Sequence, residues 1–314
     1  MLVMSKIGII GCGFVGSTIA YTLAVTGLVN EIVIVDLNKE KAEGDALDIN
    51  HGISLVKPIN IYAGEIKDLE GCNIVVITAG VNRVPSSSRL ELLKDNVRIF
   101  KDLIPKIAKV NDNAIYLVVS NPVDILTYVT HKILGGDHKK VIGSGTVLDS
   151  SRYRYILSQC LDIDPRNIHA YIIGEHGDTE FPVWSSASVC GMSIEEYCKF
   201  SKSTLSCDNK LEIEKRVRGS GMEIIRKKGA TYYAVAMTVM RICECILRDE
   251  RSILPVSSLI SNCYGINNVS LSLPTILGSE GVDKVIEIPL TDCEIEKLIL
   301  SANTLKKAIS DVGF

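Results

Sequence analysis

The sequence predicts an α/β fold, with a doubly wound parallel sheet followed by a mixed α/β domain. Short buried apolar runs alternate with helical patterns through the first half of the chain, which is the rhythm of a doubly wound sheet. The pattern changes after about residue 144, and 314 residues with 46% hydrophobic content suffice for two domains. We therefore expect one domain over residues 1–144 and a second over residues 145–314.

Five apolar runs in the first half are typical of buried parallel strands. They are Lys6 to Ile10, Glu31 to Asp36, Asn73 to Thr78, Ala114 to Ser120 and Lys140 to Gly143. The second half predicts a strand at 168–173, a long helical stretch at 211–248 and short alternating strands around 253–287. Apolar residues three and four apart over 292–311 predict an amphipathic helix that packs on the rest of the fold.

The charge and cysteine content favour small-molecule partners. A net charge of −3 provides no basic field for a nucleic acid, and no Lys/Arg run favours a membrane surface. No apolar run approaches the roughly 18 to 20 residues that span a bilayer, and a signal-peptide pattern is absent. The ten cysteines lack disulfide-framework spacing, so most should be reduced and buried. We expect a cytoplasmic protein without a metal.

A glycine-rich turn follows the first predicted strand and leads into a helical pattern that continues to about Thr26. It reads Gly11-Cys12-Gly13-Phe14-Val15-Gly16. Gly11 permits the turn, Gly13 lets the backbone approach a pyrophosphate, and Gly16 lets the helix pack close to the strand. The phosphates would meet the helix N-terminus, where free N–H groups and the helix dipole favour an anion.

An acid at the end of the second predicted strand completes this pattern. Asp36 follows Gly16 by twenty residues, a spacing that suits hydrogen bonds to both ribose hydroxyls of NAD and repels the extra phosphate of NADP. The glycine motif alone is compatible with a structural turn. Strand, turn, helix and acid together predict an NAD site formed by Gly11, Gly13, Phe14, Val15, Gly16 and Asp36.

Two polar patches end predicted strands, where open α/β sheets build their sites. They read Ser120-Asn121-Pro122-Val123-Asp124 and Gly174-Glu175-His176-Gly177-Asp178. Between them, Asp149 and Arg152 lie three residues apart in a helical stretch and so share a face. A helix cap would explain Asp149 alone, and a local ion pair would explain Arg152 alone. Combined with a cofactor motif, the set indicates catalysis.

Several segments in sequence order resemble the family of L-lactate and malate dehydrogenases. They are GCGFVGSTIA, DINHG, SNPVDILTY, VIGSGTVLDSSRYR and AYIIGEHGDTEFPVWS, and the resemblance covers essentially the whole chain. It implies a Rossmann domain followed by a substrate domain. It also implies hydride transfer between the nicotinamide and C2 of a 2-oxo or 2-hydroxy acid.

The resemblance assigns roles residue by residue. His176 resembles the acid/base that protonates the keto oxygen, which a histidine can do near neutral pH. Asp149 resembles its carboxylate partner, and Arg152 resembles the bidentate clamp on the substrate carboxylate. Asn121 would hydrogen-bond near the reacting oxygen and border the cofactor, and the peptide bond between Asn121 and Pro122 is expected to be cis.

The segment GVNRVPSSSR, residues 80–89, resembles the family's mobile lid over nicotinamide and substrate. Arg89 resembles the arginine that closes onto the reacting carbonyl and polarises it. Arg83 falls where lactate enzymes typically have glutamine and malate enzymes arginine. A second substrate carboxylate favours a cation there, by roughly 1.5 to 3 kcal/mol for a charge-assisted hydrogen bond. The lid also lacks the family's usual Pro-Gly-Glu-Thr-Arg, reading Pro-Ser-Ser-Ser-Arg instead.

Segments outside the lid resemble the lactate branch, namely GEHGDTE with the following PVW, IGSGT and GATYY. Thr231, within Gly-Ala-Thr-Tyr-Tyr, sits where that branch typically has threonine beside the substrate methyl. We therefore expect an L-lactate dehydrogenase that reduces pyruvate with NADH. A malate dehydrogenase is the alternative because of Arg83, and a catalytically inactive NAD-binding protein is a remote one.

Arg154 and His169 match positions where bacterial lactate dehydrogenases of this family bind fructose 1,6-bisphosphate between subunits. Both side-chain types suit a phosphate. The resemblance thus implies a homotetramer activated by the sugar bisphosphate, with plain surface charge as the alternative explanation of the two residues.

Overall fold

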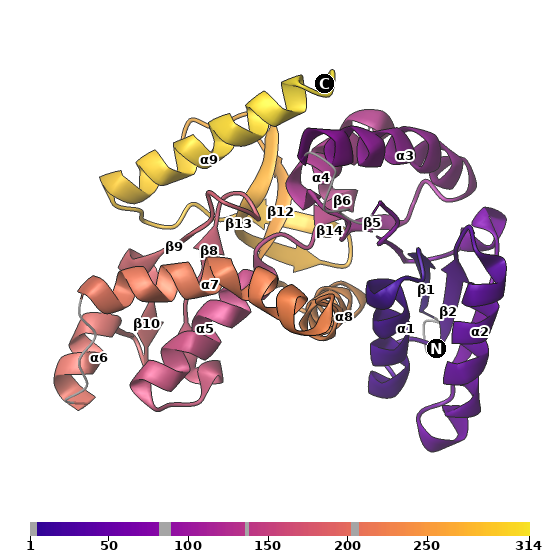
Figure 1. Ribbon diagram of the computed structural model, residues 1–314, viewed down its shortest axis with the longest axis horizontal. Coiled ribbons are helices and arrows are strands. Elements are labelled where there is room, and N and C mark those ends of the chain that lie inside the picture. Colours follow the sequence, from indigo (N-terminus) through magenta and orange to yellow (C-terminus); the bar gives the residue numbers. More distant parts are fainter. Residues whose placement is uncertain (1–4, 82–88, 136–137, 202–206) are drawn as a thin grey trace.

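A nine-stranded sheet runs through both halves of the protein (Figure 1). The structure is a computed structural model that describes residues 5–81, 89–135, 138–201 and 207–314. The strand order is β14-β13-β12-β6-β5-β4-β1-β2-β3. The strands are β1 (Lys6–Ile10), β2 (Glu31–Val35), β3 (Asn60–Ala63), β4 (Ile74–Ile77), β5 (Ile115–Val118), β6 (Val141–Gly143), β12 (Ser252–Ile260), β13 (Val269–Gly278) and β14 (Gly281–Val285).

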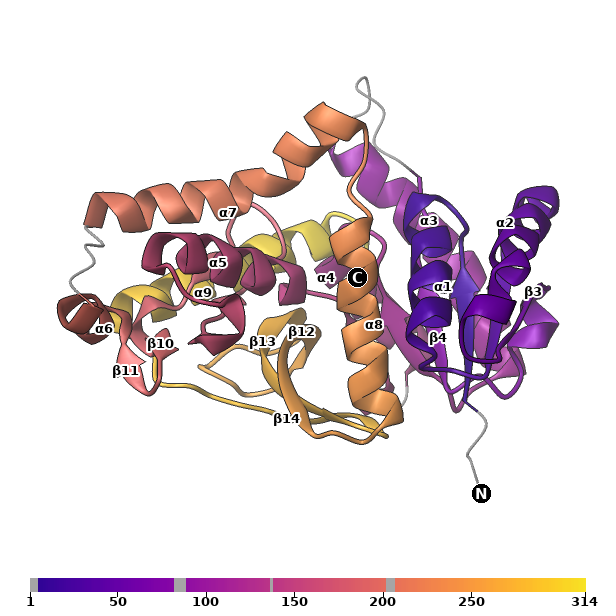
Figure 2. The ribbon, with the colours of Figure 1, turned by 90° about the horizontal axis from the view of Figure 1, so that it is seen from below.

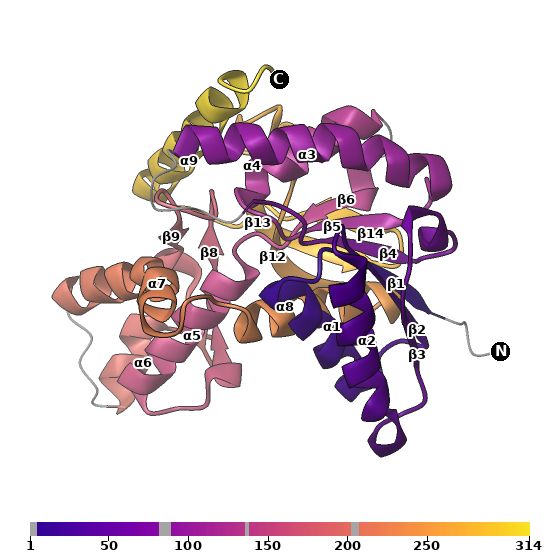
Figure 3. The ribbon, with the colours of Figure 1, turned by 45° about the vertical axis from the view of Figure 1, so that its right-hand side comes forward.

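Six of these strands are parallel and form a doubly wound unit, so the predicted fold class is confirmed. Helices α1 (Phe14–Thr26) and α2 (Lys39–His51) cover one face, together with α8 (Tyr233–Leu247). Helices α3 (Arg89–Val110), α4 (Val123–Leu134) and α9 (Asp292–Ser310) cover the other (Figure 3). Because both faces are covered, the central strands are almost entirely apolar and buried and do not alternate.

The order of the parallel strands reverses between β1 and β4. Ligands of open α/β sheets bind at such a switch point, beyond the carboxyl ends of the strands. The glycine-rich turn follows β1 at this edge of the sheet. All five strands predicted in the first half are present, with bounds that differ by no more than a few residues. Strand β3 was not predicted, since it is a four-residue edge strand with one buried residue.

The second half departs from the sequence expectation in three places. The strand predicted at 168–173 is two short strands, β7 (Ile168–His169) and β8 (Ile172–Ile173), which belong to different sheets. The helix predicted at 211–248 is divided into α7 (Cys207–Lys228) and α8. The break falls at Gly229, whose φ of +87° ends α7 in the left-handed region that glycine adopts without strain.

The strands expected as short around 253–287 are the long β12 and β13, which pair along nine residues. They join the first-half sheet where Ser257 of β12 pairs antiparallel with Gly143 of β6. The division of the chain at residue 144 stays a prediction. The remaining elements are α5 (Val147–Leu161), α6 (Ile194–Ser201), β9 (Phe181–Pro182), β10 (Ser188–Val189) and β11 (Met192–Ser193).

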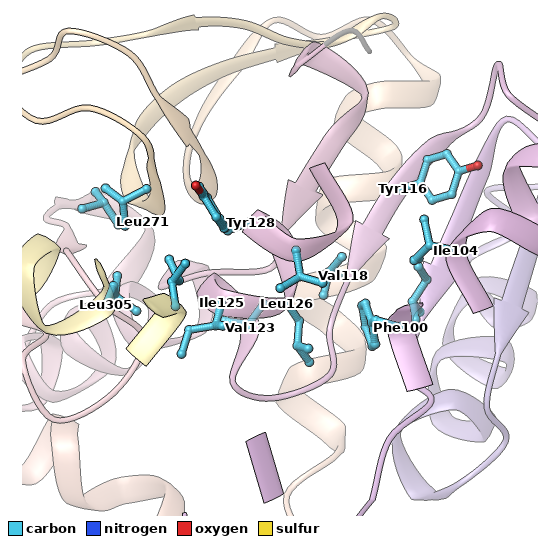
Figure 4. Packing of buried hydrophobic residues seen from close by; sticks show 14 of the residues in the cluster. Phe100, Ile104, Tyr116, Val118, Val123, Ile125, Leu126, Tyr128, Leu271 and Leu305 are labelled. Atoms are coloured by element: carbon cyan, nitrogen blue, oxygen red, sulfur yellow. The ribbon is translucent and has the colours of Figure 1, made fainter. Parts of the chain in front are cut away.

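The C-terminal helix is present as predicted. A capping box of Thr291 and Glu294 fixes its first turn. Its apolar face packs on α4 and β13, where Leu305 lies near Leu271 in the core that Figure 4 shows. The nine described cysteines are free and six of them are buried, as expected. Within the described ranges, no helix combines the length and apolarity that crossing a bilayer requires.

This core generates a stability prediction. Leu271 is fully buried beneath α9, so Leu271→Ala should lower the free energy of unfolding by about 2 to 5 kcal/mol through lost burial and a residual cavity. Ile253 of the neighbouring β12 is 42% exposed, and Ile253→Ala should cost about 1 kcal/mol or less. Urea denaturation of the two variants measures both values. Equal losses would contradict the placement of Leu271 in the core.

Candidate active site

Two of the three glycines in the turn after β1 are required by close backbone contacts. A Cβ on Gly16 would lie 1.8 Å from the carbonyl oxygen of Gly11. Gly11 has a φ of +96°, and its Cβ would lie 2.9 Å from the backbone nitrogen of Ala79. Gly13 differs, because a Cβ there would meet no atom within 4 Å. The turn is therefore tight on its inner side and open at Gly13.

The open side of the turn is the N-terminus of α1. Gly13 is its N-cap and makes no side-chain hydrogen bond, and the first turn of α1 contains no acidic residue. Free N–H groups at a helix N-terminus favour an anionic ligand. This geometry is what the sequence predicts for a dinucleotide pyrophosphate.

Asp36 follows β2 and lies against this turn. Its Oδ2 accepts a hydrogen bond from the backbone N–H of Cys12 at 2.7 Å, and its Oδ1 accepts one from Asn38 at 2.8 Å. Burial works to raise the pKa of Asp36, but these two hydrogen bonds lower it below its ordinary value. The side chain is thus held as a carboxylate, and each oxygen has a second lone pair that can accept from a ribose hydroxyl.

An aromatic stack joins the turn to the connection between α7 and α8. The ring of Phe14, 67% exposed, stacks on Tyr232 with centroids 5.3 Å apart and planes 16° apart. The Nζ of Lys228 lies 3.5 Å from the centroid of the Tyr232 ring. Helix α8 accordingly lies beside α1 (Figure 2). Thr231 is half-buried in this connection, and its predicted contact with a substrate methyl stays a prediction.

The structure brings His176, Asp149 and Arg152 together. The Nδ1 of His176 lies 2.6 Å from Oδ2 of Asp149, and Arg152 donates from Nη1 to Oδ1 of Asp149 at 2.8 Å. Asp149 is 1% exposed in the first turn of α5, and Arg152 is one turn further along the same face. One buried carboxylate therefore binds the imidazole with one oxygen and the guanidinium with the other.

This arrangement favours a protonated imidazole. Burial acts to lower the pKa of His176, but the charge and hydrogen bond of Asp149 outweigh it and raise the pKa to about 9. For Asp149 burial acts in the opposite direction, and His176 and Arg152 hold its pKa below the ordinary value. Since a carboxylate only accepts, Nδ1 carries a hydrogen and Nε2 is the nitrogen left to exchange a proton with a ligand.

Asn121 and His176 line the same cavity. Its other lining residues are Val119, Ser144, Gly145, Leu148, Val235 and Thr238. The peptide bond between Asn121 and Pro122 is cis, as expected. The backbone carbonyl of Asn121 accepts a hydrogen bond from the Asn96 side chain at 2.8 Å, which fixes the segment after β5. The cavity has an apolar lining with a few polar groups, the usual composition of a small-molecule site.

Two buried acids near His176 received no role from the sequence. Asp124 accepts from the backbone N–H of His176 at 2.7 Å through Oδ2, and burial raises its pKa to about 6. Glu180 is 5% exposed, with Oε2 at 4.0 Å from Nδ1 of His176. Both lie in or beside the polar patches, and that position is the only feature of the sequence that distinguishes them from other acids.

Asp149, His176 and Glu180 also place possible metal-ligand atoms within 4.8 Å of one another. Arg152 already neutralises Asp149, and a metal would have to displace the hydrogen from Nδ1 of His176. The cluster therefore suits a proton better than a metal ion.

Arg154 is half-buried and contacts Ala170, the residue that directly follows the exposed His169. Arg154 donates from Nε to the carbonyl oxygen of Ala170 at 3.0 Å, and its guanidinium carbon lies 5.5 Å from the centroid of the Tyr171 ring. His169 is exposed on β7, directly before Ala170. Their predicted binding of a sugar bisphosphate stays a prediction.

Of the two arginines in the predicted lid, the structure describes only the backbone of one. Arg83 lies outside the described residues. Arg89 begins α3, and its side chain is also outside what the structure describes. The lid position expected for both remains a prediction.

The glycine turn separates folding from cofactor binding. Gly13→Ala should leave the melting temperature unchanged, because its Cβ meets no protein atom, yet it should weaken NADH binding by at least about tenfold where the backbone must approach the pyrophosphate. Gly16→Ala should lower the melting temperature, since its Cβ overlaps Gly11. Thermal melting and NADH fluorescence titration measure the two effects. Unchanged NADH affinity in Gly13→Ala would contradict this placement of the pyrophosphate.

Family models cover both halves of the chain. Residues 5–143 match the lactate/malate dehydrogenase NAD binding domain, and residues 146–313 match the lactate/malate dehydrogenase alpha/beta C-terminal domain. The chain is 55% identical over 309 residues to the L-lactate dehydrogenase of Thermoanaerobacterium saccharolyticum, covering 98% of this chain and 99% of the relative. It is 52% identical over 308 residues to L-lactate dehydrogenase 1 of Clostridium acetobutylicum, covering 98% of each.

Solved structures agree with these matches. A lactate dehydrogenase from a Medee basin deep-sea metagenome library superposes with a TM-score of 0.95 at 42% identity over 99% of each chain. The minor L-lactate dehydrogenase of Enterococcus mundtii superposes with a TM-score of 0.95 at 37% identity over 98% of each chain. With the glycine turn and Asp36 in dinucleotide-binding geometry, the chain belongs to the lactate/malate dehydrogenase family and is an NAD-dependent 2-hydroxy acid dehydrogenase.

Proposed function

We propose that the protein is an L-lactate dehydrogenase that reduces pyruvate to L-lactate with NADH. The observation that carries this proposal is the buried carboxylate of Asp149, which binds both His176 and Arg152. His176 in turn lines a cavity together with Asn121. The named relatives that span nearly the whole chain are L-lactate dehydrogenases, which favours lactate as the 2-hydroxy acid.

His176 is the proton donor in this proposal. Bound NADH supplies a hydride to C2 of the keto acid and, as NAD, accepts it in reverse. The C=O π bond breaks as the hydride arrives, and Nε2 of His176 gives its proton to the oxygen, which leaves a neutral imidazole. Asp149 orients the ring through Nδ1 and stabilises the imidazolium before the transfer.

Arg152 binds the substrate carboxylate. Its guanidinium is held to Asp149 through Nη1 and is 16% exposed, so its remaining N–H groups have a fixed orientation. A planar guanidinium matches a carboxylate in a bidentate pair, and the position of Arg152 beside His176 sets which end of the substrate faces the proton donor. Asn121 lines the cavity close to the place where the keto oxygen would lie.

Malate dehydrogenase is the second candidate because of Arg83. An arginine at the far end of the substrate would pair with a second carboxylate, and for a methyl group it would lose solvent without gaining a partner. Thr231, in the connection beside Tyr232, favours the methyl group of pyruvate over the second carboxylate of oxaloacetate. We therefore assign Arg83 to the lid edge, where its long stem carries the charge to solvent, and assign closure onto the carbonyl to Arg89.

We further propose that fructose 1,6-bisphosphate binds at Arg154 and His169 between subunits of a homotetramer. Support comes from the bond of the Arg154 guanidinium to the carbonyl oxygen of Ala170 and from the exposure of His169, the residue before it. A doubly phosphorylated sugar would bridge two such surfaces and favour the assembled state. The cytoplasmic location expected from the sequence stays part of this proposal.

Comparing two substrates tests the choice of acid. The ratio kcat/KM should favour pyruvate over oxaloacetate by about tenfold or more, with Arg83→Gln leaving that preference in place. Added fructose 1,6-bisphosphate should raise the activity in the same assay. In size-exclusion chromatography it should also produce a larger species. An oxaloacetate preference that Arg83→Gln reverses by about ten- to a hundredfold would instead identify a malate dehydrogenase. Equal activity and size with and without the bisphosphate would remove the effector.

The role of His176 has its own test. His176→Asn should lower kcat for pyruvate by about a hundred- to ten-thousandfold while NADH binding is kept. Because the pKa of His176 is raised, the proton needed for reduction is present below about pH 9 and is lost as the pH rises through that value. The pH profile of kcat/KM should therefore fall near pH 9, and Asp149→Asn should move the fall to lower pH. NADH binding without turnover in the unaltered protein would favour the binding-protein alternative.

A further inference from the structure

The carboxyl group of Glu180 lies on the same side of the His176 ring as Asp149 and has no role in the steps above. Its Oε2 is 4.0 Å from Nδ1 of His176, while Oδ2 of Asp149 is 2.6 Å from the same atom. Only 5% of Glu180 is exposed. A second buried acid therefore faces the proton-carrying ring without replacing its hydrogen-bond partner.

The other charged groups around Glu180 and His176 come from three helices and from the turn that carries His176. Asp149 and Arg152 belong to α5, Arg218 to α7 and Asp124 to α4, while Glu175 directly precedes His176 in the turn. Arg218 donates from Nη2 to the backbone carbonyl of Glu180 at 3.0 Å, which fixes the backbone of Glu180 against α7. The placement of the Glu180 carboxyl is thus set by α7 and by the turn, and not by a bond to His176.

The surroundings determine when Glu180 carries a charge. Burial and the nearby Asp149 carboxylate raise the pKa of Glu180, and His176, Arg152 and Arg218 only partly offset them. Glu180 therefore keeps its proton at pH values where an exposed glutamate has lost it. When it does ionise, it places a second negative charge about 4 Å from the imidazole ring.

We propose that Glu180 is a positioning residue that acts through His176, and that its carboxylate, once formed, holds the catalytic proton on the imidazole. The inference rests on the proposed role of His176 as proton donor. Pyruvate reduction needs the imidazolium and lactate oxidation needs the neutral ring. Ionised Glu180 thus extends reduction toward alkaline pH and suppresses oxidation over the same range.

Glu180→Gln tests this with almost no change in shape. At pH values where the wild-type carboxyl keeps its proton, kcat/KM for pyruvate should match that of the variant. At higher pH, the fall in kcat/KM should occur at a pH lower by about one unit or more in Glu180→Gln, since an opposite charge within about 4 to 6 Å shifts a pKa by roughly one to three units. The profile is measured from about pH 6 to about pH 10.

Two further variants complete the design. Glu180→Asp keeps the charge but withdraws it by one methylene, so it should shift the profile less than Glu180→Gln does. Glu294→Gln is the matched control, because Glu294 is 7% exposed and its carboxyl binds Ser185 and Thr291. It should lower the melting temperature without moving the profile. If Glu180→Gln does not fold, the shift in Glu180→Asp decides.

A second readout does not depend on turnover. The chain has five histidines, and the ring Cε1 proton of His176 is identified in NMR spectra as the signal lost in His176→Asn. Titration of that signal should give a lower pKa in Glu180→Gln than in the wild type. An unchanged ring titration together with an unchanged kinetic profile would overturn the proposal. Absent pyruvate turnover would refute the proposed function, and the ring titration would still decide the role of Glu180.

Discussion

The site depends on one buried charge, the carboxylate of Asp149. A carboxylate that is 1% exposed is costly to bury unless it is paired and hydrogen-bonded. Its two oxygens are used by His176 and Arg152, so pairing the buried charge and orienting the two side chains are one and the same arrangement. Removing either partner would leave the charge of Asp149 poorly compensated, so the three side chains depend on one another.

The fold gathers these groups from distant parts of the chain. Gly174 forms an antiparallel bridge with Ser272 of β13, and this bridge brings the turn carrying His176 to the sheet. Asp124, in the first turn of α4, accepts from the backbone N–H of His176. Asp149 comes from α5, which follows β6. The imidazole is therefore positioned by the extended sheet through the backbone and by α5 through the ring.

The glycine-rich turn and the connection between α7 and α8 are in contact on one face of the sheet. Phe14 opens α1 at the glycine-rich turn, and its stack on Tyr232 reaches the connection that carries Thr231. Both the parallel unit and the antiparallel strands β12 and β13 support this arrangement, because they form one continuous sheet.

The sequence by itself determined the local features. Glycine spacing, the acid after β2 and unbroken apolar strands have short-range causes, so the doubly wound unit, the NAD site and the shared helix face of Asp149 and Arg152 could be predicted from neighbouring residues. Tertiary structure alone decided the rest. The pairing of β12 with β6 and the distance from Glu180 to His176 depend on how separate elements pack, and burial changes the charge state of a carboxyl only after that packing exists. A residue such as Glu180 is an ordinary acid in the sequence, and it becomes a partner of His176 only where α5 and α7 enclose it.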